Sequence, residues 1–153
     1  MNIAVGSDHA GYELKEAVLR YLEGQGIDCK DFGAYSLDSV DYPDIGAQAS
    51  EAVANGEFDR GILICGTGIG MSITANKVPG IRAALCASAY CAAMSREHND
   101  ANILVLGSRI TDQDTALEIV RTWLATDFPN DPRHARRIGK IAEIENRFHG
   151  GGR

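Results

Sequence analysis

Cys65 opens a glycine-rich segment, Cys65-Gly-Thr-Gly-Ile-Gly70, that directly follows a run of apolar residues. Three closely spaced glycines allow the backbone to bend around an anion, and a helix that starts there would present free N–H groups. A thiol beside a helix N-terminus is in an environment that favours the thiolate, which can act as a nucleophile or as a base. A plain tight turn is the simpler alternative, and the three glycines argue against it.

Two further segments carry side chains capable of acid–base chemistry. Asp8 and His9 follow the first apolar run, and His98-Asn99-Asp100 follows a helical stretch. Taken singly, Asp8 could cap a helix and His98 could cap or flank a loop. We expect these groups and Cys65 to face one edge of a sheet, and such a joint placement favours an active site.

Arg133 and Arg137 are four residues apart in the last helical segment, so they share one face of that helix. Arg136 and Lys140 lie on its flank. From spacing alone, a solvated basic face is the better interpretation. A phosphate clamp becomes a fair competitor because the chain also contains a loop shaped for an anion.

Several common motifs are excluded around Cys65. The chain has no Gly-Lys-Ser/Thr, so it lacks a P-loop, and Cys86 stands about where a dinucleotide fold needs a ribose-binding acid. Cysteine-based phosphatases resemble a cysteine followed by five residues and an arginine, and that sixth position is Met71 here. A receiver domain would need aspartate at position 65.

The composition indicates one globular domain. The chain has 153 residues, of which 44% are hydrophobic and 24% charged. A net charge of −6 argues against nucleic-acid binding. Because the chain shows neither a secretory leader nor a membrane span, we expect a cytoplasmic protein. Cys29, Cys86 and Cys91 are interpreted as small buried hydrophobes, and no spacing suggests a metal site.

Apolar runs alternate with helical periodicity along the whole chain. Strands are expected at residues 2–6, 27–32, 61–65, 81–86 and 103–107. Helices are expected near 14–22 and 44–55, from the glycine loop to 77, near 88–97 and 111–126, and from 132 onward. We expect a single domain over residues 1–149 and a flexible tail at 150–153.

This alternation predicts an α/β fold, a three-layer α/β/α sandwich around a five-stranded parallel sheet. The flavodoxin-like strand order 2-1-3-4-5, with an extra C-terminal helix, fits the length best. Strands 1 and 3 are neighbours in that order, so Ser7-Asp8-His9 and Cys65–Gly70 would converge at the crevice beyond their carboxyl ends.

The motifs as a set resemble type B ribose-5-phosphate isomerases, in a family that also holds galactose-6-phosphate and allose-6-phosphate isomerases. The resemblance runs from residue 1 to about residue 147. The segments that carry it are Gly6-Ser-Asp-His-Ala-Gly11, Asp41-Tyr-Pro-Asp44, Ile64-Cys-Gly-Thr-Gly-Ile-Gly70, Ala75-Asn-Lys77, Gly80-Ile-Arg82, Ser95-Arg-Glu-His-Asn-Asp100 and Leu106-Gly-Ser-Arg109.

The resemblance implies an aldose–ketose isomerase of carbohydrate metabolism that interconverts ribose 5-phosphate and ribulose 5-phosphate through an enediolate, with no metal or other cofactor. Cys65 matches the base, and His98 matches the acid that opens the sugar ring, with Thr67 nearby. Asp8 and Asn99 match groups that bind sugar oxygens. The residues that match the enediolate cradle are Gly66, Gly68, Ile69 and Gly70, and those that match the phosphate clamp are His9, Arg109, Arg133 and Arg137.

The resemblance also implies a homodimer, or as in some family members a tetramer, in which Arg133 and Arg137 reach the neighbouring subunit's site. One branch of the family lacks the cysteine and carries a glutamate where this chain has Met71, so this chain resembles the cysteine branch. Arg136 leaves open which neighbour faces the phosphate. Two alternatives remain: an isomerase of a six-carbon sugar phosphate, and a non-catalytic flavodoxin-like module that binds a phosphorylated ligand.

Overall fold

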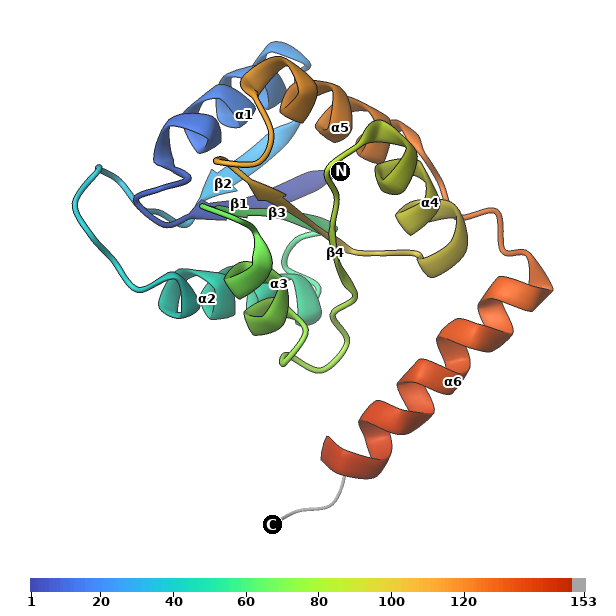
Figure 1. Ribbon diagram of the computed structural model, residues 1–153. Helices are drawn as coiled ribbons and strands as arrows, with labels where there is room; N and C mark the ends of the chain where they lie inside the picture. Colours follow the sequence, from blue (N-terminus) through green and yellow to red (C-terminus); the bar gives the residue numbers. More distant parts are fainter. Residues whose placement is uncertain (150–153) are drawn as a thin grey trace.

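The computed structural model describes residues 1–149 and shows a five-stranded parallel sheet between two layers of helices (Figure 1). This confirms the expected α/β/α sandwich. The predicted tail at 150–153 lies outside the described residues. The elements in chain order are β1 (Asn2–Ser7), α1 (Tyr12–Gly24), β2 (Asp28–Asp31), α2 (Tyr42–Ala54), β3 (Arg60–Cys65), α3 (Ile69–Ala75), β4 (Ala83–Leu85), α4 (Ala89–Asn99), β5 (Ile103–Gly107), α5 (Gln113–Ala125) and α6 (Pro132–His149).

The central strands β1, β3 and β5 are mostly apolar and are buried except at the first residues of β1 and β3, Asn2 and Arg60, as expected of strands covered on both faces. One face packs on α1, α4 and α5, where Trp123 is fully buried. The other face packs on α2 and α3. The two helix layers lie above and below the sheet in Figure 1.

The sheet order is β2-β1-β3-β5-β4, so the predicted order of the last two strands is wrong. Every residue of β5 is buried, and such a strand is suited to a central position. β4 has only three residues and ends at the 41%-exposed Leu85, which suits a short edge strand. As a result Cys65 pairs with Gly107, and the segments after β3 and β5 lie side by side.

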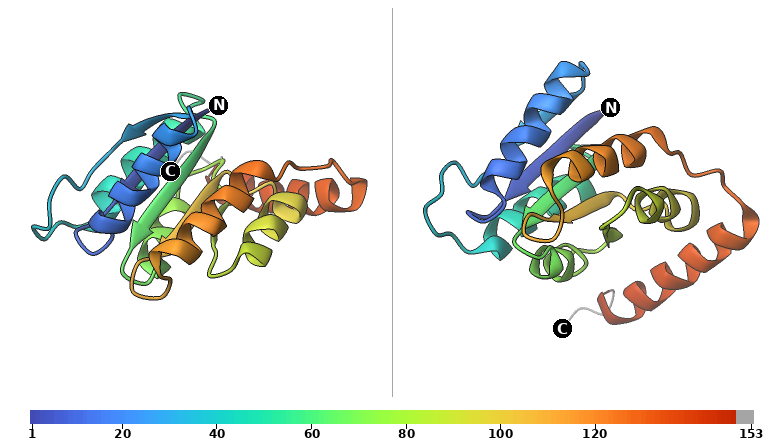
Figure 2. Two further views of the ribbon diagram at one scale, coloured as in Figure 1. Left: turned by 90° about the horizontal axis from the view of Figure 1, so that it is seen from above. Right: turned by 45° about the horizontal axis from the view of Figure 1, so that its top comes forward.

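The helix α6 stands away from the sandwich (Figure 2). It begins where expected, with Asp131 accepting a hydrogen bond from the backbone N–H of Arg133 (2.8 Å). His134 is the residue of α6 that is buried. Within residues 1–149, no helix is both long and apolar enough to cross a membrane.

Candidate active site

An open cavity of about 380 Å³ lies at the carboxyl ends of β1 and β3. Sequence reasoning had predicted most of its lining and missed Tyr42 and Ile73. The lining residues are Asp8, Tyr42, Cys65, Gly66, Thr67, Ile69, Gly70, Ile73 and Arg109. The topology therefore brings the cysteine, a carboxylate and an arginine to one place, where ligands bind in open parallel sheets.

Backbone hydrogen bonds tie the segments around this cavity together. The Asp8 N–H donates to the carbonyl of Ile64 (3.2 Å), and the N–H groups of Ser108 and Arg109 donate to Cys65 and Gly66 (both 2.9 Å). The Asp8 side chain is 6% exposed, and its Oδ1 accepts from the Gly11 N–H (3.0 Å). The carboxylate and the cysteine are thus held on a rigid frame.

The glycine segment turns sharply into α3. Gly68 has a φ of +79°, a left-handed conformation that glycine adopts without a steric penalty. Thr67 Oγ1 accepts from the Ile69 N–H (3.3 Å), which orders the turn. A Cβ at Gly70 would lie 2.5 Å from the Cζ atom of Tyr42, so the tyrosine ring packs directly on this backbone. The Asp41-Tyr-Pro-Asp44 segment was the signal available for Tyr42.

Cys65 and Met71 differ sharply in position. Cys65 is 4% exposed and lines the cavity. Met71 is fully buried among the apolar residues beneath the loop, where its sulfur lies against Gly46. The thioether therefore belongs to the core, and the thiol of Cys65 is the nucleophilic side chain that the loop presents.

His9 follows Asp8 in the turn after β1 and is partly buried. Its Nδ1 accepts a hydrogen bond from the Val40 N–H (3.2 Å). A neutral imidazole whose Nδ1 accepts carries its proton on Nε2. His9 can therefore donate from Nε2 to an anion.

His98 and Asn99 do not join this cavity within one chain. α4 continues to Asn99, so both residues lie in its last turn and not in a loop. The Asn99 carbonyl accepts from Arg82 Nε (2.9 Å), just before β4, at the amino end of the sheet. β3 separates the two ends by roughly 16 Å, at ~3.3 Å per residue. The expectation that His98 and Cys65 face one sheet edge of the same subunit is wrong.

His98 meets the first turn of α6 instead. Its ring stacks on that of His134, with centroids 4.2 Å apart and planes at 20°. His134 Nε2 lies 3.3 Å from Nη2 of Arg133. Burial lowers the pKa of His134, and the charges of His98, Arg133 and Arg137 lower it further, partly opposed by Asp131. The amino end of the sheet therefore carries two stacked imidazoles, His98 and His134, beside the cationic side chains of Arg133 and Arg137.

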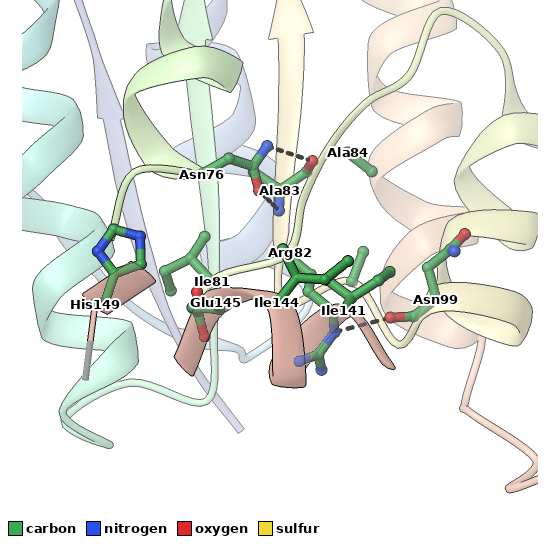
Figure 3. Close-up of a pocket in the computed structure, with 11 residues that line it drawn as sticks. Asn76, Ile81, Arg82, Ala83, Ala84, Asn99, Ile141, Ile144, Glu145 and His149 are labelled. Atoms are coloured by element: carbon green, nitrogen blue, oxygen red, sulfur yellow. Dashed lines mark hydrogen bonds between the residues drawn. The ribbon is translucent and has the colours of Figure 1, made fainter. Parts of the chain in front are cut away.

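A groove of about 480 Å³ separates α6 from the β4 edge of the sheet. In Figure 3, Ile141, Ile144 and Glu145 of α6 face Ile81 and Arg82 across it, with Asn99 at one end. Ile141 and Ile144 are about half exposed (49% and 50%). The groove thus has an apolar wall that the described part of the chain leaves uncovered.

Among the residues described, no cluster of three or more His, Cys, Asp or Glu side chains could hold a metal ion.

A family model described as ribose/galactose isomerase matches residues 3–141. The chain belongs to this family. The resemblance noted from the motifs and the expected isomerase class are thereby confirmed.

Individual relatives match almost end to end. Ribose-5-phosphate isomerase B of Escherichia coli is 46% identical over 95% of this chain and 97% of its own. The structure of ribose-5-phosphate isomerase B from Clostridium thermocellum is 57% identical, with a TM-score of 0.95, over 97% of this chain and 99% of its own. That from Mycoplasma genitalium, solved with bound ribulose 5-phosphate, is 40% identical, with a TM-score of 0.90, over 95% and 96%.

Proposed function

We propose that this protein interconverts ribose 5-phosphate and ribulose 5-phosphate. The observation that carries the proposal is that Cys65, Asp8 and residues of the glycine loop line one cavity on a rigid frame. Moving a proton between adjacent sugar carbons needs a base and hydrogen-bond donors directed at the developing oxyanion. The relatives named for this reaction align over nearly the whole chain.

The reaction divides into two steps in this proposal. First, His98 moves the proton of the C1 hydroxyl to the ring oxygen; the bond between C1 and that oxygen breaks, and C1 becomes an aldehyde. The Cys65 thiolate then takes the proton from C2, giving an enediolate held by the loop N–H groups. The proton returns to C1, and the O2 proton moves to O1 beside Thr67. Asp8 and Asn99 bind the sugar hydroxyls.

Because Cys65 and His98 lie at opposite ends of the sheet within one chain, we propose that the protein is a homodimer in which they meet between subunits. His98 lies at the opposite end of the sheet from the Cys65 of its own chain. Ile69 and Ile73 of α3, next to the cavity, are 56% and 58% exposed. The apolar wall of the groove beside Asn99 is complementary to such a helix, so α3 of the partner subunit would bring its Cys65 towards this subunit's His98.

The phosphate would be bound from both subunits. His9 and Arg109 lie on the cavity side, whereas Arg133 and Arg137 lie beside His98 on α6. Arg137 is four residues from Arg133 and shares its face of α6, whereas Arg136 lies on the flank; this spacing favours Arg137 over Arg136 as the second arginine of the clamp. The phosphate is remote from the reacting carbons, and charge-assisted hydrogen bonds to it hold the sugar in position.

Incubation of the protein with ribose 5-phosphate in EDTA-treated buffer tests the reaction. We expect ribulose 5-phosphate to form without added metal, and Cys65→Ala to abolish it. Allose 6-phosphate and galactose 6-phosphate, tested in parallel, measure the preference for five carbons. Binding of ribose 5-phosphate without any turnover would favour a non-catalytic module.

A further inference from the structure

His134 contacts two residues, His98 and Arg133, that have separate roles in the proposed reaction. It is 8% exposed, whereas Arg133, Arg136 and Arg137 around it are exposed. Its ring lies flat against His98 of α4, and its Nε2 faces the guanidinium of Arg133. One buried side chain therefore contacts both the proposed ring-opening acid and a residue of the proposed phosphate clamp.

The contact with Arg133 determines which nitrogen of His134 carries its proton. A guanidinium can only donate, so Nε2 accepts and the proton of the neutral ring lies on Nδ1. Burial and the surrounding positive charges favour this neutral form. A neutral aromatic ring stacked on His98 tolerates either charge state of that imidazole, because a cation over an aromatic face is attracted.

We propose that His134 is a positioning residue that holds the His98 ring and the Arg133 guanidinium as one unit for presentation to the partner's cavity. The stack fixes the plane of the ring that must move a proton, and the Nε2 acceptor fixes the guanidinium. This inference rests on the proposed isomerase function. The competing explanation is that His134 merely packs α6 onto α4.

Two variants separate the contacts. His134→Phe keeps a flat ring for the stack but removes the acceptor, and His134→Gln keeps an acceptor but removes the ring. Ile138→Ala, one turn along α6 at another partly buried position, is the packing control.

A comparison of two substrates separates ring opening from proton transfer at carbon. Ribulose 5-phosphate cannot form a furanose ring, because its C5 oxygen carries the phosphate. Exchange of its C1 hydrogen with solvent deuterium therefore reports proton transfer without ring opening, whereas turnover of ribose 5-phosphate needs both steps.

A misplaced catalytic group can cost about 10²-fold, so His134→Gln should lower kcat for ribose 5-phosphate by about tenfold or more. Deuterium exchange into ribulose 5-phosphate should stay within about twofold. His134→Phe should keep kcat within about threefold and raise KM for both substrates several-fold. Parallel losses on both substrates in His134→Gln, or equal behaviour of all three variants, would overturn the proposal.

A readout independent of activity separates this proposal from the proposed function. In NMR spectra, ring-current shifts of the His98 ring protons, assigned with His98→Asn, should persist in His134→Phe and vanish in His134→Gln. Unchanged shifts in His134→Gln would overturn the positioning role. If the shifts followed this pattern but the wild type had no isomerase activity, the proposed function would be wrong, whereas the contact between His134 and His98 would stand.

Discussion

The carboxyl-end cavity and the α4–α6 end of the molecule hold their functional groups by different means. Around the cavity, backbone hydrogen bonds tie the segments after β1, β3 and β5 together, and Asp8 and Cys65 are almost fully buried. At the other end, Arg133 and Arg137 stand exposed on a helix that projects from the sandwich (Figure 2). A single buried residue, His134, anchors the described part of that helix.

This contrast suggests that the base at the cavity and the arginines of α6 serve different tasks. Chemistry at carbon needs a base fixed to within a fraction of an ångström, and the sheet edge supplies that precision within one subunit. Capture of a phosphorylated sugar tolerates side chains that adjust to the ligand. The α6 arginines, on a helix free to contact another subunit, suit that second task.

The largest effect is expected at the rigid end. Cys65→Ala should abolish isomerisation and deuterium exchange while sugar-phosphate binding persists, because the thiolate acts on a carbon-bound proton. Cys91 is exposed on α4, so the expectation that it is buried was wrong. Cys91→Ser is the matched control and should leave turnover unchanged. Wild-type exchange in Cys65→Ala would assign the base to another residue.

Sequence patterns predicted the cavity because its components are local. A buried apolar run followed by glycines identifies both the end of β3 and the loop, and parallel strands end at one edge. The position of β4 depended on the relative burial of two strands, which no single segment reveals. The expected placement of His98 was wrong because a helix that follows a parallel strand carries the chain back to the amino end of the sheet. Tyr42 acts through contact with Gly70, which only the folded chain shows.

At the α4–α6 end, the effect should depend on the substrate. His98→Asn should lower turnover of ribose 5-phosphate by about 10²–10⁴-fold, the usual value of general acid–base catalysis. Deuterium exchange into ribulose 5-phosphate should fall far less, since that substrate has no ring to open. An equal loss on both substrates would leave His98 a binding or structural role.

The clamp should show a smaller effect, mainly on KM. Arg137→Ala removes a charge-assisted hydrogen bond of about 1.5–3 kcal/mol, equivalent to about a 10- to 100-fold rise in KM. Arg136→Ala, a neighbouring cation on α6, should change KM by less than about twofold. Steady-state kinetics of both variants shows which of the two arginines binds the phosphate. Equal, small changes in KM in both variants would mean that the arginines of α6 form a solvated basic face and not a phosphate clamp.

The smallest effect concerns the anchoring of α6 and its dependence on pH. The pKa of His134 is lowered below 6.5 in the folded protein, by burial first and then by His98, Arg133 and Arg137, against Asp131. Its contribution to stability is therefore complete above about pH 6.5 and is lost as the pH falls through that value towards the folded-state pKa.

Hydrogen exchange at pH 7.5 and 5.5, corrected for intrinsic rates, measures this effect. Amides of α6 should lose protection at the lower pH, and those of β3 should not. His134→Phe removes the titrating group, so the loss in α6 should shrink in that variant. The same loss of protection in α6 with and without His134 would contradict this assignment.

Subunit mixing tests the central claim, that each site is completed by His98 of the partner. The Cys65→Ala and His98→Asn proteins, each expected to be inactive or nearly so, are mixed under conditions of confirmed subunit exchange. In a two-fold dimer, half of the random pairs are heterodimers with one intact site each, so about a quarter of wild-type activity should return. If activity stays at the level of the parents, the site does not combine Cys65 of one subunit with His98 of the other.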